Sequence, residues 1–200
     1  MLGKTHIAFA LGATSSVVYV ASLGGALLDV GEVSLFYLAV AFGALLPDID
    51  EPNSTLGRKT LGISNIIKTI FGHRGFTHSA FCVFFLCAML IFLYVLLEVE
   101  VFLNSVSSFL GEYGVTLSSE SVWILCFGLV CGYVLHIAGD MLTISGVPIL
   151  LPFRTKSYFL LPKPFRFKTG GVFDYMICAF SVALFGFINF KIYGINLAII

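Results

Sequence analysis

Two histidines flank an arginine in the segment GHRGFTHS, residues 72–79, immediately before a long apolar run. Neutral imidazole is a common ligand of transition metals, and a guanidinium group binds phosphate or carboxylate through two parallel hydrogen bonds. A single histidine here would be typical of a side chain that reaches for water, but the pair favours a site. We therefore interpret His73 and His78 as metal ligands and Arg74 as a substrate-binding residue or a partner of a nearby carboxylate. Thr77 is the expected N-cap of the following helix.

His136 and Asp140 are four residues apart in the segment HIAGD. On a helix this spacing puts both side chains on one face about one turn apart, where they can chelate one ion. Imidazole with carboxylate suits zinc, with manganese or iron as alternatives. A polar pair that caps a helix end is the other interpretation. Ionisable groups in an apolar helix favour the metal.

Asp48 and Asp50 follow Pro47 in the segment PDID, where an apolar run ends. Two carboxylates this close repel each other unless a cation or a proton lies between them. The pattern predicts that one of them ligates a metal, while the other orients a ligand histidine or acts as the base. A helix-end turn capped by either residue is the alternative. Which carboxylate has which role stays open.

His6 enters the first apolar run, and Asp174 begins the last one. We expect His6 to be a ligand. Asp174 is a weaker candidate, because a carboxylate at a helix start also complements the helix dipole. These candidates exceed the needs of one tetrahedral ion, so one or two divalent transition-metal ions are expected, with zinc foremost.

The composition is that of an integral membrane protein. Of the 200 residues, 58% are hydrophobic and 11% are charged, and the mean hydropathy is +1.02. A soluble domain averages about 25% charged residues. The formal net charge is zero, which gives no reason to expect a nucleic-acid partner. The five cysteines all fall in apolar runs, so we interpret them as packing residues.

A membrane-spanning helix needs about 20 apolar residues. Five segments reach or approach this length, and they predict an all-α, polytopic membrane helix bundle that forms a single domain over residues 1–200. The segments are residues 7–28, 33–47, 79–97, 121–138 and 175–190. The second segment is the shortest, so Asp48 at its end is expected to lie at the depth of the hydrocarbon core.

The basic residues predict the orientation, because cytoplasmic loops retain Lys and Arg. Ten of the eleven fall before the first segment, between the second and third, or between the fourth and fifth; they are Lys4, Arg58, Lys59, Lys68, Arg74, Arg154, Lys156, Lys163, Arg166 and Lys168. The N-terminus is therefore predicted to be cytoplasmic and the C-terminus outside. The same topology gathers the histidines and aspartates at the cytoplasmic ends of the helices.

Two connecting segments on that side have their own character. The run ISNIIKTIF, residues 63–71, has the pattern of a short amphipathic helix in the membrane interface. Residues 147–171 mix proline, aromatic and basic residues without a helical period. We expect an extended or hairpin-like segment on the headgroup layer.

Taken in order, four stretches resemble the YdjM-like family of inner-membrane proteins, which are regarded as metal-dependent hydrolases. They are the helix with His6, LLPDIDEPNSTLGR at 45–58, GHRGFTHS at 72–79 and GYVLHIAGDMLTISGVPILLPF at 132–153. The resemblance implies a multi-helix membrane protein with a His/Asp site at the cytoplasmic side and hydrolase activity. The implied site residues are His6, Asp48, Asp50, His73, His78, His136 and Asp140.

A more distant similarity is to zinc-dependent phospholipase C and P1 nuclease. In those all-helical phosphodiesterases an early His, an Asp, a His and an HxxxD pair hold the metals in that order. The present chain has no His after His136, so the similarity implies a mononuclear or binuclear site rather than a trinuclear one.

Together these observations predict a membrane-bound, metal-dependent hydrolase that cleaves a phosphate ester at the cytoplasmic surface. A lipid-linked phosphate ester is one candidate substrate. Asp48 or Asp50 would act as the base, and Arg74, with Arg58 behind it, would hold the phosphate. The alternatives are a metal or proton transporter and a non-catalytic scaffold stabilised by metal. The bilayer is the expected partner, and the oligomeric state stays open.

Overall fold

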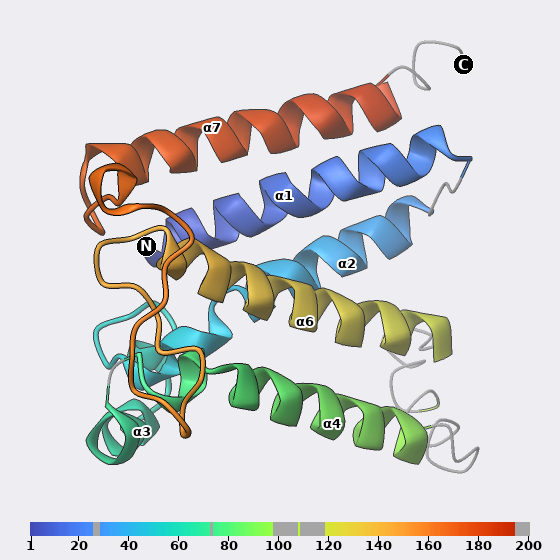
Figure 1. The fold of residues 1–200 in the computed structure, drawn as a ribbon. Coiled ribbons are helices and arrows are strands. Elements are labelled where there is room, and N and C mark those ends of the chain that lie inside the picture. The colour runs from blue at the N-terminus through green and yellow to red at the C-terminus, as the bar shows by residue number, and fades with distance from the viewer. Residues whose placement is uncertain (26–28, 73, 98–107, 109–118, 195–200) are drawn as a thin grey trace.

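The computed structural model describes residues 1–25, 29–72, 74–97, 108 and 119–194. Within these residues the chain is helical, with two isolated β-bridges and no strand. Five long helices lie side by side (Figure 1): α1 (Gly3–Leu23), α2 (Val30–Gly43), α4 (Ala80–Leu97), α6 (Ser119–Met141) and α7 (Val172–Asn189). Successive helices run in opposite directions along the chain, so the neighbours α1 and α7 are parallel, as are α2 and α6. The predicted all-α helix bundle is confirmed.

Among the described residues, four apolar stretches are long enough to cross a membrane: Gly3–Leu23, Val30–Asp50, Glu120–Met141 and Val172–Gly194. The fifth predicted segment is shorter, an apolar helix over Ala80–Leu96. The second stretch is completed by a 3₁₀ turn, η1 (Leu46–Asp50), which carries both aspartates of PDID. The helix predicted to run to residue 47 ends at Gly43. Pro47 is the reason, because it has no N–H to donate to the carbonyl of Gly43.

The core lies between α1, α2 and α6. Val33, Phe36, Tyr37 and Val40 of α2 are buried together with Ala10 of α1 and Ala44 after α2. Helix α2 approaches α6 most closely where α6 carries glycine: a Cβ added to Gly132 would lie 2.1 Å from the carbonyl oxygen of Val40. Only a residue without a side chain lets the two backbones meet there.

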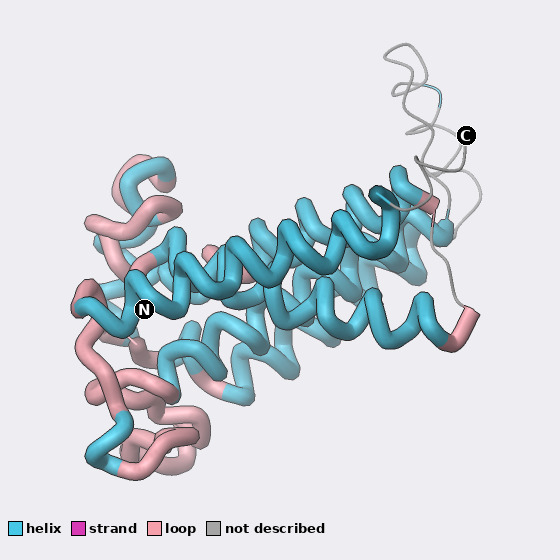
Figure 2. The backbone as a smooth tube through the Cα atoms, turned by 90° about the horizontal axis from the view of Figure 1, so that it is seen from above, coloured by secondary structure: helices cyan, strands magenta, loops and turns pink. Residues whose placement is uncertain are grey.

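One end of the bundle, which we call the site end, collects the short elements (Figure 2). It comprises the first turns of α1, α4 and α7, the last turns of α2 and α6, and the loops beside them. The remaining elements at this end are η1, η2 (Gly57–Lys59), α3 (Ile63–Phe71), η3 (Phe76–His78) and η4 (Lys163–Phe165), whereas the π-helical turn η5 (Phe190–Gly194) follows α7 at the opposite end.

Two loop predictions have different outcomes. The hairpin-like character of residues 147–171 agrees with the structure, because Val147 and Tyr158 exchange both backbone hydrogen bonds, at 3.1 and 2.8 Å. The prediction that Thr77 caps the following helix is wrong. Thr77 lies in η3, and Ser79 is the cap, since its hydroxyl accepts the N–H of Cys82 at 3.1 Å. The Thr77 hydroxyl is engaged by Asp50 instead.

The close approach of α2 and α6 generates a stability prediction. Gly132→Ala should destabilise the protein by about 1–3 kcal/mol, because the added methyl group must push the two backbones apart. Gly186→Ala in α7 is the matched control, since nothing lies within 4 Å of its added Cβ. Denaturant unfolding of the detergent-solubilised protein measures the difference. Equal stability of the two variants would contradict the packing described above.

Candidate metal centre

His136 stands at the centre of the site, near the end of α6. Its Nδ1 donates a hydrogen bond to the carbonyl oxygen of Ala44, at 2.7 Å, which fixes the ring and its tautomer. The Nε2 lone pair therefore points into the site. The ring is fully buried, and it owes its position to the contact of α2 with α6 at Gly132.

His6, in the first turn of α1, stacks on His136. The two ring centroids are 3.6 Å apart, and the planes are 11° from parallel. His6 is fully buried, and among the described residues neither of its ring nitrogens has a hydrogen-bond partner. Its Nε2 lies 3.2 Å from Asp140 Oδ1, but the contact lacks hydrogen-bond alignment. Buried polar atoms are rarely left without partners, so a missing ligand is the natural explanation.

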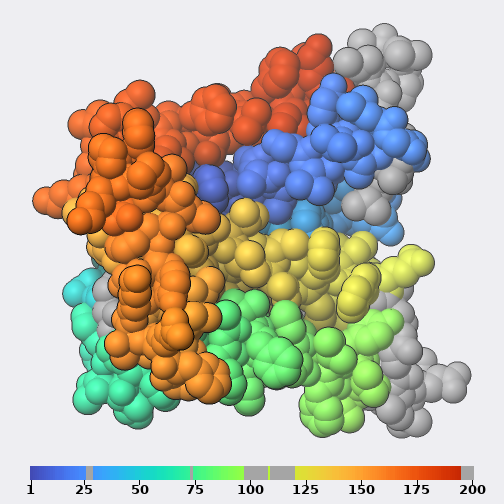
Figure 3. All heavy atoms as spheres, viewed as in Figure 1, coloured from blue at the N-terminus to red at the C-terminus, as the bar shows by residue number. Residues whose placement is uncertain are grey.

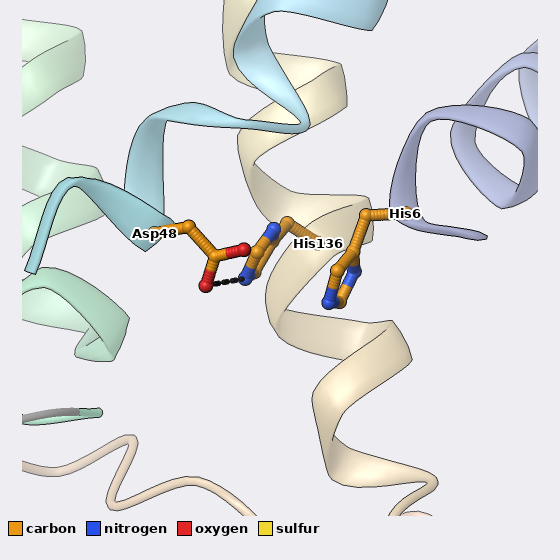
Figure 4. A group of neighbouring side chains, drawn as sticks. All are labelled: His6, Asp48 and His136. Carbon is orange, nitrogen blue, oxygen red and sulfur yellow. Dashed lines mark ion pairs between the residues drawn. The ribbon is translucent and has the colours of Figure 1, made fainter. Parts of the chain in front are cut away.

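Asp48 approaches the same ring from η1, with its Oδ1 3.7 Å from His136 Nε2. Figure 4 shows the ring of His136 between Asp48 and His6, so three elements supply one cluster. One donor atom from each of these residues lies within 4.8 Å of the other two, which is close enough for a shared metal ion. The side chain of Asp48 is 13% exposed, whereas the two histidines are sealed.

A second group of donors shares His136. His78 Nε2 lies 3.2 Å from His136 Nε2 and 3.5 Å from Asp140 Oδ2. Asp140 Oδ2 is itself 3.8 Å from His136 Nε2, as the spacing of four residues predicts. All three side chains are buried. Since Nδ1 of His136 is bound to Ala44, its single remaining lone pair can ligate one ion, which takes donors from either group.

Asp50 lies behind His78 rather than in either group. Its Oδ2 accepts hydrogen bonds from the hydroxyl of Thr77, at 2.5 Å, and from the backbone N–H of Arg74, at 3.0 Å. The same oxygen is 3.2 Å from His78 Nδ1. Asp50 thus orients the imidazole of His78 and leaves its Nε2 facing the site.

The charge of His78 follows from these neighbours. Burial by itself lowers the pKa of His78, but the hydrogen bonds and charges of Asp140 and Asp50 outweigh burial and raise the pKa to about 9. The imidazole then carries a proton at neutral pH and links the two carboxylates. The two buried carboxylates therefore favour a positive charge at the position between them.

Arg74 adds a second positive charge. Its Nη2 donates to Asp140 Oδ1 at 2.8 Å, and its Nη1 donates to Thr143 Oγ1 at 3.2 Å. The amino group of Met1 also donates to Asp140. Arg74 has a positive φ of 56°, which is uncommon for a residue with a side chain of this size. The backbone turn thus directs the guanidinium inward, while its N–H holds Asp50.

A polar cleft of about 580 Å³ opens beside Arg74. Its other walls come from the segment after α6, through Ser145, Gly146, Pro148, Ser157 and Thr169. No lining residue is acidic, and three carry hydroxyl groups. In Figure 3 the orange segment around residues 142–171 spreads over the site end, so this loop forms the outer wall of the site.

The remaining predicted residues lie elsewhere. His73 falls outside the described residues. Arg58 is exposed on η2, where its Nε donates to the carbonyl oxygen of Ser54 at 3.3 Å. Asp174 is buried, and its Oδ2 accepts the backbone N–H groups of Leu2 and Gly170, at 3.1 and 2.7 Å. Asp174 therefore joins the starts of α1 and α7, and neither donor group includes it.

Several contacts were not anticipated from the sequence. Thr143 is fully buried, donates to the carbonyl oxygen of Asp140 and accepts from Arg74. Thr143 lies beyond the end of α6 at Met141, so the helical spacing of the sequence does not reveal this contact. The carbonyl of Ala44 has no signal in the sequence either, since any residue supplies a carbonyl.

The donor set fits a transition-metal ion. Two imidazoles and a carboxylate converge in the first group, and the sealed ring of His6 lacks a partner among the described residues. Mixed nitrogen and oxygen ligands of this kind suit zinc, iron or manganese more than calcium or magnesium. The structure thus contains groups of His and Asp residues that could bind a metal ion.

Comparison with known proteins identifies the family of the chain. The family model of the YdjM inner membrane protein matches residues 1–198, nearly the whole chain. The chain belongs to the YdjM inner membrane protein family. It is therefore a multi-pass protein of the inner membrane, in agreement with its apolar helices. The family resemblance inferred from the four sequence stretches is confirmed.

Individual relatives support the assignment. The chain is 41% identical over 118 residues to the inner membrane protein YdjM of Escherichia coli and to that of Shigella flexneri, which is 59% of this chain and 48% of each relative. The match thus spans about half the length of these two proteins. The protein YvsG of Bacillus subtilis is 27% identical over 179 residues, 90% of this chain and 88% of that protein. No solved structure matches the chain.

The converging donors predict a metal content that depends on His136. Protein purified in detergent should contain at least one equivalent of transition metal, and His136→Ala should lose it, because both groups share this ring. Asp174→Asn is the control, as it is buried at the same end but belongs to neither group. Elemental analysis of the folded variants measures the result. Metal-free wild-type protein, even after incubation with zinc, would contradict the site.

Proposed function

We propose that this protein is a membrane-bound, metal-dependent hydrolase of a phosphate ester. The observation that carries the proposal is the position of Arg74, which joins Asp140 of the donor cluster to the wall of a 580 Å³ polar cleft. A cluster of metal donors and an anion-binding side chain thus lie at the same opening, as metal-assisted phosphoester hydrolysis requires.

The metal would be held by His136 with His6, Asp48 and Asp140, and by His78 once the cation replaces the proton that His78 holds between Asp50 and Asp140. A bound transition metal polarises a phosphoryl oxygen and lowers the pKa of a bound water to about 7. Zinc is the proposed ion on the basis of its preference for imidazole and carboxylate ligands. His73 stays a predicted ligand.

Arg74 is proposed to bind the phosphate. Its described contacts with Thr143, Gly146 and Asp140 use three of the five guanidinium N–H groups. Donors therefore remain for an anion in the cleft, where the hydroxyl groups of Ser145, Ser157 and Thr169 add neutral partners. Arg58, exposed on η2, is a possible outer contact for a larger substrate.

The two aspartates of PDID are proposed to divide the remaining work. Asp50 is fully buried and orients His78, so it is a positioning residue. Asp48 is partly exposed, and only its Oδ1 faces His136. We propose that Asp48 binds the metal through Oδ1 and that its second carboxylate oxygen, on a side chain that is partly exposed, accepts a proton from water.

The proposed site faces the cytoplasm, because ten of the eleven basic residues lie on the side where it is built. The distribution of charge also favours an enzyme over a transporter. In each of the four membrane-spanning stretches, the ionisable residues lie near an end, and the middle part contains no Asp, Glu, Lys, Arg or His. An ion or proton pathway is expected to have ionisable groups staggered across the bilayer.

The proposal predicts hydrolysis of phosphate esters by the purified protein. Phosphomonoesters, phosphodiesters and lipid phosphates should be assayed in detergent after loading with zinc, manganese or iron. Turnover of at least one class that disappears with chelator and with His136→Ala is the expected result. Absence of turnover on all three classes by metal-loaded protein would favour a metal-stabilised scaffold.

Arg74 provides a sharper test. Arg74→Lys should lower kcat/KM by about 10²-fold, because the ammonium group loses the paired geometry with which a guanidinium holds phosphate. Metal content should be unchanged. Lys191→Gln, in η5 after the far end of α7, controls for the loss of a basic residue. An Arg74→Lys enzyme with normal kcat/KM would remove Arg74 from the substrate site.

A further inference from the structure

Helix α3 exposes an apolar face, whereas a helix on a water-facing surface would turn such a face toward the protein. Ser64 is 1% exposed, and Lys68 reaches Glu51, just after η1, with 2.7 Å between Nζ and Oε2. These polar residues face the protein. Ile63, Ile66 and Ile70 are 54, 60 and 65% exposed, and their spacing places them on one outer face.

The apolar surface continues beyond the helix. Leu61, just before α3, is 99% exposed, and Phe71 at its end is 49% exposed. The ring of Phe71 stacks on Phe76 with 5.3 Å between centroids, and Phe76 meets Phe81 of α4 at 5.7 Å. Past Phe81, α4 exposes further phenylalanines, so one apolar surface runs from α3 along an apolar helix that packs on the membrane-spanning α6.

The direction of α3 fits the plane of a membrane. In Figure 1 α3 is seen nearly end-on at the site end, whereas the long helices run across the view. Nine residues cover only about 14 Å, too short to cross a bilayer. The exposed basic residues Arg58 and Lys59 lie close by on η2, where they can meet anionic headgroups.

We infer that Leu61, α3 and Phe71 form a lipid-docking surface that seats the site-bearing loop in the leaflet at the site end. The occupant is lipid rather than another protein, because this surface is continuous with the exposed apolar side of α4, which packs beside the membrane-spanning α6. Two connections extend the seating to the site. The pair Lys68–Glu51 ties α3 to the turn with Asp48 and Asp50, and α3 ends three residues before Arg74, the start of the segment that runs to His78.

Single tryptophans test this inference without metal or substrate, so the outcome does not depend on the proposed activity. The chain has one tryptophan, Trp123, which is first changed to Phe. In that background Ile66→Trp reports the apolar face and Asn65→Trp, the adjacent exposed polar position, is its matched control. Both proteins are reconstituted into phosphatidylcholine–phosphatidylglycerol vesicles with and without brominated acyl chains.

We expect brominated lipid to quench the tryptophan at position 66 about twofold more than the one at position 65, and acrylamide to show the reverse order. Equal acrylamide access without lipid quenching would overturn the inference. Shielding at position 66 that depends on protein density but not on brominated lipid would also overturn it and would indicate a second copy. Ile70→Trp and Thr69→Trp repeat the comparison should the first pair fail to fold.

Discussion

Buried negative charge is the constraint around which the site end is organised. Asp50 and Asp140 are 0 and 1% exposed at the end of an apolar bundle, where an uncompensated carboxylate is costly. The protein surrounds them with donors: Arg74 contacts both, through its backbone N–H and its guanidinium, and His78 lies between them. The same need for positive charge makes the cluster a place for a metal cation.

Helix packing determines which donors remain for that cation. The contact of α2 with α6 at Gly132 brings the carbonyl of Ala44 to His136, and this hydrogen bond commits one ring nitrogen and frees the other. The start of α1 then lays His6 on the ring of His136. Gly132, within helix α6, therefore helps to determine the chemistry at the end of that helix, because the two backbones can approach only at glycine.

The cleft, the donor cluster and helix α3 all lie at the site end. The loop after α6 supplies the wall of the cleft, and the loop before α4 supplies Arg74, His78 and the proposed lipid-docking helix. Such loops are the usual location of functional residues, held by a rigid scaffold. A substrate that arrives from the leaflet would therefore meet the anion-binding and metal-binding groups without leaving the interface.

The sequence by itself determined the helix bundle, its family and the end at which the ionisable residues gather. Runs of about 20 apolar residues have few alternatives to a membrane helix, and alternating directions place His6, Asp48, His78, His136 and Asp140 together. The pairing of His136 with Asp140 was equally accessible, since a spacing of four residues has one geometry on a helix.

Only the tertiary structure decided how these residues divide. Asp48 and Asp50 are two positions apart and chemically identical, yet one faces His136 and the other lies behind His78, because a 3₁₀ turn after Pro47 separates them. Thr77 contacts Asp50 instead of capping a helix, and Asp174 joins two helix starts away from the donor groups. Such roles depend on contacts between residues up to 172 positions apart, which local pattern does not encode.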